Sequence, residues 1–132
     1  LMRALAPGLA LPNGLPPRFL SHDAAVVRAY VDDALVHDRI SARLLSAMLD
    51  AIDVAQQGAA ALDLPTLLLV SGNDKLVDPA GSEAFFRQLP AAASALHVYP
   101  RLYHELFNET EAAQVFGDLD NWLAGLRERV AA

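Results

Sequence analysis

Hydrophobic residues follow two different periods along the chain, and these periods predict its elements. Prolines and glycines interrupt both periods between Leu1 and Leu20, so we expect an irregular connecting segment there. Ser21 is placed to cap a helix that continues to Val31, with Asp23 in its first turn. The chain is therefore predicted to become regular only after its first twenty residues.

The period then changes from that of a helix to that of a buried strand. A second helix is expected from about Ser41 to Gly58, because apolar residues recur there at three and four positions. Its apolar stripe comprises Leu44, Leu45, Met48, Leu49 and Ile52. Residues 65–70 form an almost continuously apolar run that is followed by the turn residues 71–74. Such a run predicts a strand that is buried on both faces, as in parallel sheets covered by helices.

A helix, a strand and a further helix complete the predicted pattern. Asp78 as N-cap and Pro79 at the first helical position predict a helix that stops before Pro90. A shorter strand is expected over about residues 94–99, and an amphipathic helix from Ala112 to the C-terminus. The fold class is therefore α/β, with a βαβα unit that contains a right-handed crossover. Two strands do not make a stable parallel sheet, so we expect this unit to be incomplete on its own.

Composition and charge exclude several classes of protein. Hydrophobic residues make up 54% and charged residues 20% of the chain, which excludes intrinsic disorder. The formal net charge is -6 and basic residues form no run, which argues against nucleic acid or an anionic membrane surface as partner. Cysteine is absent, which excludes disulfides and thiolate chemistry. No apolar run is long enough for a membrane span or a signal peptide, so we expect a cytoplasmic protein.

Asp74 and His104 are the residues best placed to carry chemistry. Each follows the C-terminal end of a predicted strand, and the C-terminal ends of parallel strands meet at one edge of the sheet. Strands lie about 5 Å apart, so a carboxylate in one turn can reach an imidazole in the next. An Asp bonded to one ring nitrogen orients the His and leaves the other nitrogen as a general base.

Each of these residues also has a purely structural interpretation. Asp74 can serve as a turn residue, and Asp78 competes for the role of acid, although the proline after it explains Asp78 as an N-cap. The other histidines, His22, His37 and His97, lack a comparable context. The segment that begins at His104 starts like the zinc motif His-Glu-x-x-His, but Asn108 occupies the second ligand position. We therefore expect no metal site.

Several segments of the chain resemble a known family. Residues 64–79 (LPTLLLVSGNDKLVDP), residues 103–109 (YHELFNE) and the final helix with Trp122 and Leu123 resemble the C-terminal half of α/β-hydrolases. The resemblance is to the monoacylglycerol lipase and lysophospholipase group, which is also classed as serine aminopeptidase S33-like. Segments 11–14, 21–23 and 36–38 are similar to the end of the cap region and the chain that leads out of it. The resemblance thus divides the chain into residues 1–38, the end of the cap and a connecting segment, and residues 39–132, the C-terminal part of the core.

The resemblance implies specific roles for residues of this chain. Asp74 would be the triad acid, His104 the triad base, and Leu76 and Val77 would face the acyl pocket or the cap. The substrate would be an acyl ester of the monoacylglycerol or lysophospholipid type, hydrolysed without a cofactor. Glu105 and Glu109 are expected to support the His104 loop or to cap the final helix.

The chain departs from the family pattern, which leaves alternatives open. Its serines, Ser21, Ser41, Ser46, Ser71, Ser82 and Ser94, do not occur in the frame Gly-x-Ser-x-Gly. We therefore expect the nucleophile on a complementary N-terminal hydrolase segment. A noncatalytic module that binds a small apolar ligand or a partner chain through its open sheet edge is the main alternative, and a homo-oligomer is compatible with it. Peptidases and epoxide hydrolases of the same fold are further alternatives.

Overall fold

The structure, a computed structural model, describes residues 6–90 and 94–131. Eight helices and strands follow one another in these residues: β1 (Ala10–Pro12), α2 (Ala24–Asp32), β2 (Arg39–Ser41), α3 (Ala42–Gly58), β3 (Leu67–Ser71), α4 (Pro79–Phe86), β4 (Ala95–Tyr99) and α5 (Ala112–Ala131). Short 3-10 helices lie at Pro17–Phe19 (η1), Ala59–Ala61 (η2) and Leu106–Asn108 (η3). The helices expected after Ser41 and Asp78 begin as predicted, because the Ser41 and Asp78 side chains accept the N–H groups of Leu44 and Ala80.

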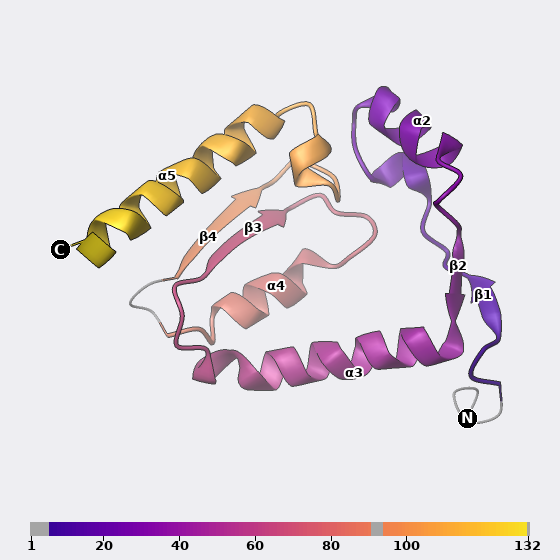
Figure 1. The fold of residues 1–132 in the computed structure, drawn as a ribbon, viewed down its shortest axis with the longest axis horizontal. Helices are drawn as coiled ribbons and strands as arrows, with labels where there is room; N and C mark the ends of the chain where they lie inside the picture. The colour runs from indigo at the N-terminus through magenta and orange to yellow at the C-terminus, as the bar shows by residue number, and fades with distance from the viewer. Residues whose placement is uncertain (1–5, 91–93, 132) are drawn as a thin grey trace.

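The second half of the chain forms a two-stranded parallel sheet between helices. β3 pairs with β4 in a register that places Leu69 opposite His97 and Ser71 opposite Tyr99. Figure 1 shows α4 on one side of this sheet and α5 on the other. The predicted strand, helix, strand, helix order is therefore confirmed, and the C-terminal ends of both strands lie at the same edge.

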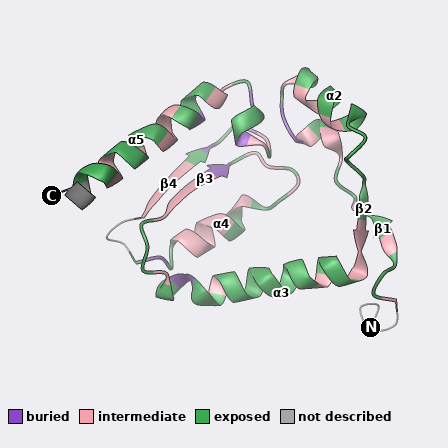
Figure 2. Cartoon of the chain, in the orientation of Figure 1, coloured by how far each residue is buried: buried purple, intermediate pink, exposed green. Residues whose placement is uncertain are grey.

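The best-buried core lies between this sheet and α5. Tyr99, Leu102, Leu106 and Val115 form one buried cluster, with Leu69 packed against it. Val115 is completely buried, and the C-terminal end of β3 is coloured purple as buried in Figure 2. The prediction that β3 is buried on both faces is wrong for its first half. Leu67 and Leu68 are only partly buried in this structure, because no third strand pairs with β3 or β4 within the described ranges.

The first forty residues are more regular than their proline and glycine content predicts. Instead of an irregular stretch, the chain contains β1, which pairs antiparallel with β2 in a register that places Leu11 opposite Ile40. Residues 1–5 of the predicted irregular segment lie outside the described residues. The prediction of Ser21 as N-cap is also wrong. Asp23 caps α2 by accepting the Ala25 N–H at 2.7 Å, whereas the Ser21 oxygen accepts the N–H of Asp23 and its hydroxyl donates to the Asn108 carbonyl.

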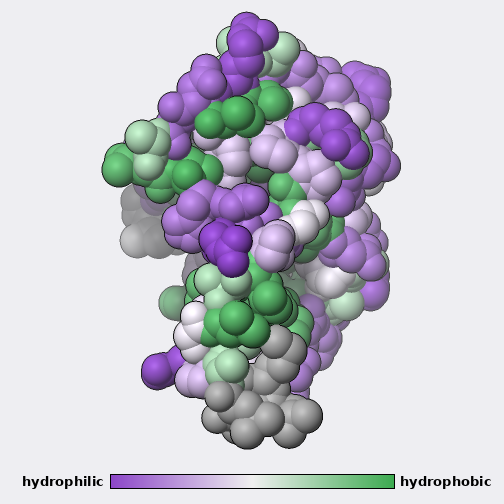
Figure 3. All heavy atoms as spheres, turned by 90° about the vertical axis from the view of Figure 1, so that its right-hand side faces the viewer, coloured by the Kyte–Doolittle hydropathy of each residue, from purple (hydrophilic) through white to green (hydrophobic). Residues whose placement is uncertain are grey.

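The apolar stripe of α3 is present but is largely exposed. Leu44, Leu45, Met48, Leu49 and Ile52 expose between 44% and 56% of their surface. α3 runs beside α4 along the lower side of the molecule in Figure 1 and is coloured mostly as exposed in Figure 2. Figure 3 also shows hydrophobic surface on the side formed by α2, β1 and β2. Exposed hydrophobic residues of these elements include Leu11 and Val31.

None of the described helices is both long and apolar enough to cross a bilayer.

Candidate active site

A tight turn after β3 brings Asp74 toward the end of β4. The N–H of Gly72 donates to the carbonyl of Tyr99 at 2.8 Å. A Cβ at position 72 would lie 2.8 Å from the Cα of Pro100, which is closer than two carbon atoms can approach. Only glycine therefore allows this contact between the two strand ends, and the turn that carries Asp74 follows directly.

Asp74 uses both carboxylate oxygens. Oδ1 accepts the N–H groups of Leu76 at 2.8 Å and Val77 at 3.0 Å, which fixes the turn. Oδ2 faces Nδ1 of His104 at 2.8 Å. Burial by itself raises the pKa of Asp74, but the hydrogen bonds from His104, Leu76 and Val77 and the charge of His104 lower this pKa below its ordinary value. The side chain, which is 10% exposed, is therefore held as a carboxylate near neutral pH.

His104 lies on the loop between β4 and η3. Its own N–H donates to the carbonyl of Phe19 at 3.4 Å, and the next N–H, of Glu105, donates to the carbonyl of Leu20 at 2.8 Å. The imidazole is 38% exposed, so a second reactant can reach the ring. The structure thus brings together the two residues that the sequence singled out, with Nδ1 facing the acid.

Of the other residues predicted for the site, Val77 lies at the site, whereas Asp78 has a structural role. Asp78, the alternative acid, caps α4 by accepting the Ala80 N–H at 2.9 Å. Val77 lines a hollow of about 190 Å³ together with Asp74 and His104. Leu76 does not line this hollow. Its backbone N–H donates to Oδ1 of Asp74. The other lining residues are Leu69, Val70, Ser71, Pro79, Ser82 and Leu106.

A second histidine and carboxylate pair lies next to the His104 loop. Nδ1 of His22 lies 2.8 Å from Oε1 of Glu109, whose side chain is fully buried. The His22 ring stacks on Tyr103, with ring centroids 3.8 Å apart. The sequence predicted that Glu109 supports the His104 loop or caps the final helix, but it did not predict the contact with His22. Its partner lies 87 residues away in the sequence, and no local pattern signals such a pair.

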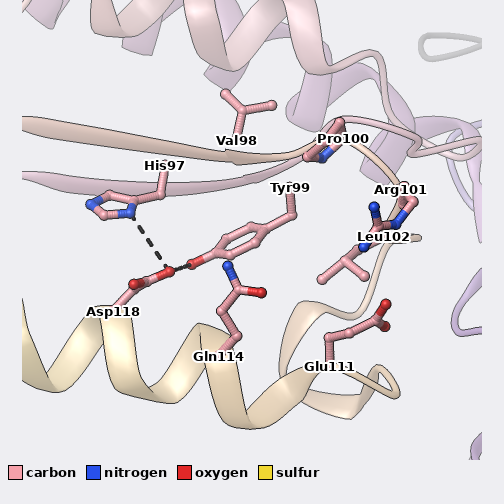
Figure 4. Close-up of a pocket in the computed structure, with 9 residues that line it drawn as sticks. All are labelled: His97, Val98, Tyr99, Pro100, Arg101, Leu102, Glu111, Gln114 and Asp118. Carbon is pink, nitrogen blue, oxygen red and sulfur yellow. Dashed lines mark hydrogen bonds and ion pairs between the residues drawn. The ribbon is translucent and has the colours of Figure 1, made fainter.

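A third histidine, His97, lies in a hollow of about 210 Å³ on the other side of β4 from the Asp74 turn. Figure 4 shows His97 and Tyr99 pointing from β4 toward Asp118 on α5. The Tyr99 hydroxyl donates to Oδ2 of Asp118 at 2.8 Å, whereas Nδ1 of His97 is 3.7 Å from the same oxygen. Burial raises the pKa of Tyr99, and the bond to Asp118 raises it further, so this hydroxyl stays protonated. In residues 6–90 and 94–131, no group of three His, Asp or Glu side chains is placed to hold a metal ion.

Comparison with known proteins places the chain in a family. The sequence model of the family described as serine aminopeptidase, S33 matches residues 1–111. The chain belongs to this family. The Asp74 turn and the His104 loop both lie within the matched residues.

The relatives include lipases, and all of those compared are longer than this chain. The chain is 37% identical over 120 residues to monoacylglycerol lipase from Mycolicibacterium smegmatis, and the match covers 90% of the chain and 42% of that protein. It is 31% identical to phospholipase YtpA from Bacillus subtilis, with coverage of 87% and 45%.

A solved structure agrees with these sequence matches. The crystal structure of Paleococcus ferrophilus monoacylglycerol lipase superposes with a TM-score of 0.88 and 34% identity, over 94% of this chain and 49% of that one. The predicted fold class, part of an α/β-hydrolase that resembles monoacylglycerol lipase, is therefore confirmed. The chain spans less than half the length of each of these three proteins.

Proposed function

We propose that this chain supplies the acid and the base of the catalytic triad of a serine ester hydrolase of the monoacylglycerol lipase or lysophospholipase type. The observation that carries the proposal is the 2.8 Å contact between Nδ1 of His104 and Oδ2 of Asp74. The two backbone N–H groups on Oδ1 prevent the acid from turning away. This is the arrangement by which a carboxylate fixes the tautomer of a catalytic histidine.

In this mechanism each proton transfer takes place at a named atom of His104. With the Nδ1 proton held by Asp74, the Nε2 nitrogen of His104 accepts the proton of a serine hydroxyl as that oxygen attacks the acyl carbon. Nε2 then returns the proton to the leaving alcohol, and an acyl-enzyme remains. In the second half of the reaction, His104 takes a proton from the water that attacks the acyl-enzyme, and it returns this proton to the serine oxygen as the fatty acid leaves. Asp74 stabilises the imidazolium in both halves without being protonated itself.

The serine belongs, in this proposal, to a complementary N-terminal hydrolase segment. Three observations support such a segment. The chain covers 42% to 49% of the length of each of the three proteins compared above. The parallel sheet has two strands in the part of the chain that the structure describes. The apolar stripe of α3 is exposed, and a covering segment would remove this surface from water.

The substrate we propose is an acyl ester, because the hollow next to His104 is lined mainly by apolar side chains. Val77, Leu69 and Leu106 lie on its wall together with the acid and the base. Each methylene that such a wall buries contributes about 0.8 kcal/mol, whereas a buried charge without a partner is strongly unfavourable. Leu76 lies outside this hollow, and in this proposal its side chain faces the cap or a further part of the acyl pocket. Monoacylglycerols and lysophospholipids combine one acyl chain with a polar leaving group and fit this description.

Two assays on the full-length protein that contains this chain test the proposal. Labelling by a fluorophosphonate probe is expected, because an activated serine reacts with it, and lack of labelling would favour a noncatalytic binding module. Rates on p-nitrophenyl esters of increasing acyl length are compared with rates on aminoacyl-nitroanilides. We expect kcat/KM to rise with acyl length and the anilides to be poor substrates. Faster cleavage of the anilides would favour a peptidase instead.

A further inference from the structure

The buried carboxylate of Glu109 joins two segments of the chain close to His104. Its side chain is 0% exposed. Oε1 accepts the N–H of Tyr103 at 2.5 Å and contacts Nδ1 of His22 at 2.8 Å, while Oε2 accepts the N–H of His22 at 2.9 Å. The hydroxyl of Ser21 is a further donor to Oε2, at 3.3 Å. One side chain therefore bridges the loop that carries His104 and the segment that leads into α2.

Three consecutive N–H groups of the His104 loop donate hydrogen bonds either to Glu109 or to segment 19–22, which Glu109 contacts. The N–H of Tyr103 is bound by Glu109 itself. The N–H groups of His104 and Glu105 donate to the carbonyls of Phe19 and Leu20, which immediately precede the residues that Glu109 binds. The ring of His22 stacks on the ring of Tyr103, which adds a side-chain contact between the same two segments. The backbone on both sides of His104 is thus fixed against segment 19–22.

The charge of Glu109 strengthens these contacts. Burial by itself raises the pKa of Glu109, but the N–H groups of Tyr103 and His22 and the His22 ring lower this pKa below its ordinary value. An ionised carboxylate binds N–H donors about twice as strongly as a neutral acceptor. The bridge is therefore made of charge-assisted bonds to a carboxylate that is itself buried.

The ring of His104 has little else to orient it. Within the described residues, Asp74 is the one hydrogen-bond partner of the imidazole, and the ring is 38% exposed. Its direction therefore follows from the backbone of the loop. We propose that Glu109 is a positioning residue that holds the His104 loop against segment 19–22, so that Nδ1 of His104 meets Asp74. This inference rests on the proposed function of His104 as the base.

Glu109→Gln in the full-length protein tests the proposal, with Glu111→Gln as a matched control. Glutamine keeps the shape of Glu109 but replaces one acceptor oxygen by an NH₂ group, which would then point at an N–H donor. We expect kcat on an ester to fall roughly 10- to 100-fold, as a catalytic group displaced by up to about 1 Å would cause, with KM little changed. Glu111→Gln removes the same charge two residues away, where the carboxylate bonds only to the Thr110 hydroxyl among the residues described, and should retain kcat.

Two further measurements distinguish positioning from stability alone. Titration with a fluorophosphonate counts active sites, so kcat is expressed per folded molecule. In protein labelled with ¹⁵N at histidine, the ring resonances of His104 should move in Glu109→Gln and stay in place in Glu111→Gln. If Glu109→Gln lowers the yield or the Tm while kcat per site and the His104 resonances are unchanged, the positioning role is refuted.

A conservative variant covers the case in which Glu109→Gln does not fold. Glu109→Asp keeps the charge and both oxygens but is one methylene shorter, so it reaches Tyr103 or His22 and not both. We expect an intermediate loss of kcat with unchanged KM, and an unchanged kcat would overturn the proposal. If the wild-type protein neither hydrolyses esters nor reacts with the probe, the proposed function fails. The His104 resonances of the two Glu109 variants then still show whether Glu109 orients the ring.

Discussion

Replacing Asp74 by asparagine should abolish proton transfer while leaving the turn intact. Three donors converge on the Asp74 carboxylate: the N–H groups of Leu76 and Val77 on Oδ1 and the His104 ring on Oδ2. Asparagine offers one acceptor oxygen. Because two backbone donors lie at the Oδ1 position, the amide oxygen is expected there and the NH₂ group faces Nδ1 of His104. Nδ1 must then accept a hydrogen bond, and the ring proton moves to Nε2.

The magnitude of the loss follows from this change of tautomer. An imidazole with its proton on Nε2 cannot take a proton from serine, and the corresponding change in serine proteases lowers kcat by about 10⁴-fold. A factor of 10⁴ corresponds to about 5.5 kcal/mol of lost transition-state stabilisation. The free energy of unfolding should change by only about 0.5 to 1.5 kcal/mol, the typical contribution of one hydrogen bond, since the two backbone bonds of the turn remain.

The assay compares Asp74→Asn with Asp78→Ala in the full-length protein, by ester hydrolysis and urea unfolding. Asp78 caps α4, so its loss should cost about 0.5 to 2 kcal/mol of stability and leave kcat nearly unchanged. The two aspartates lie in the same loop, so their variants share any general effect on this segment. If Asp78→Ala abolishes ester hydrolysis while Asp74→Asn does not, the assignment of the acid is wrong.

The pH dependence of stability gives a second readout for Asp74. Hydrogen bonds and the charge of His104 outweigh burial and hold the pKa of Asp74 below its ordinary value of 3.8. A carboxyl whose pKa is lowered by folding stabilises the protein above its unfolded pKa, and this stabilisation is lost as the pH falls through the folded pKa. The wild-type protein should therefore lose more stability than Asp74→Asn when the pH is lowered from 5 toward 2. Equal losses would contradict the pairing.

Two further predictions concern packing. Gly72→Ala should destabilise the protein by about 1 to 3 kcal/mol, because its Cβ would lie 2.8 Å from the Pro100 Cα; an unchanged urea midpoint would refute the close approach of the two strand ends. The chain produced without a complementary segment should self-associate, because α3 exposes its apolar stripe and β3 and β4 have open edges in the described structure. Light scattering after size exclusion measures this, and a monodisperse, well-folded monomer would contradict it.

Local signals in the sequence were sufficient to predict the elements of the second half of the chain. The helix expected from about Ser41 begins there, and Asp78 caps α4 as expected, because the sequence signals for both helix starts lie within a few residues. The meeting of Asp74 and His104 was predicted as well, because parallel strands place their C-terminal ends at one edge whatever the packing around them.

Features that depend on distant partners could not be predicted in this way. β1 has three residues, ends in a proline and exists because β2, far along the chain, pairs with it. The hydroxyl of Ser21 donates to the distant carbonyl of Asn108, and Asp23 is the N-cap of α2. The contact between His22 and Glu109 likewise has no periodic signature. Each of these features links the first forty residues to a segment that only the folded chain brings near.

Fluorophosphonate labelling of histidine variants of the full-length protein tests the central claim most directly. His104→Gln is compared with His97→Gln, because His97 also lies near a carboxylate, at 3.7 Å from Asp118, but outside the Asp74 hollow. If Asp74 and His104 are the acid and base of a serine triad, His104→Gln and Asp74→Asn should slow labelling by several orders of magnitude, whereas His97→Gln should label like the wild type. Rapid labelling of His104→Gln would contradict the account.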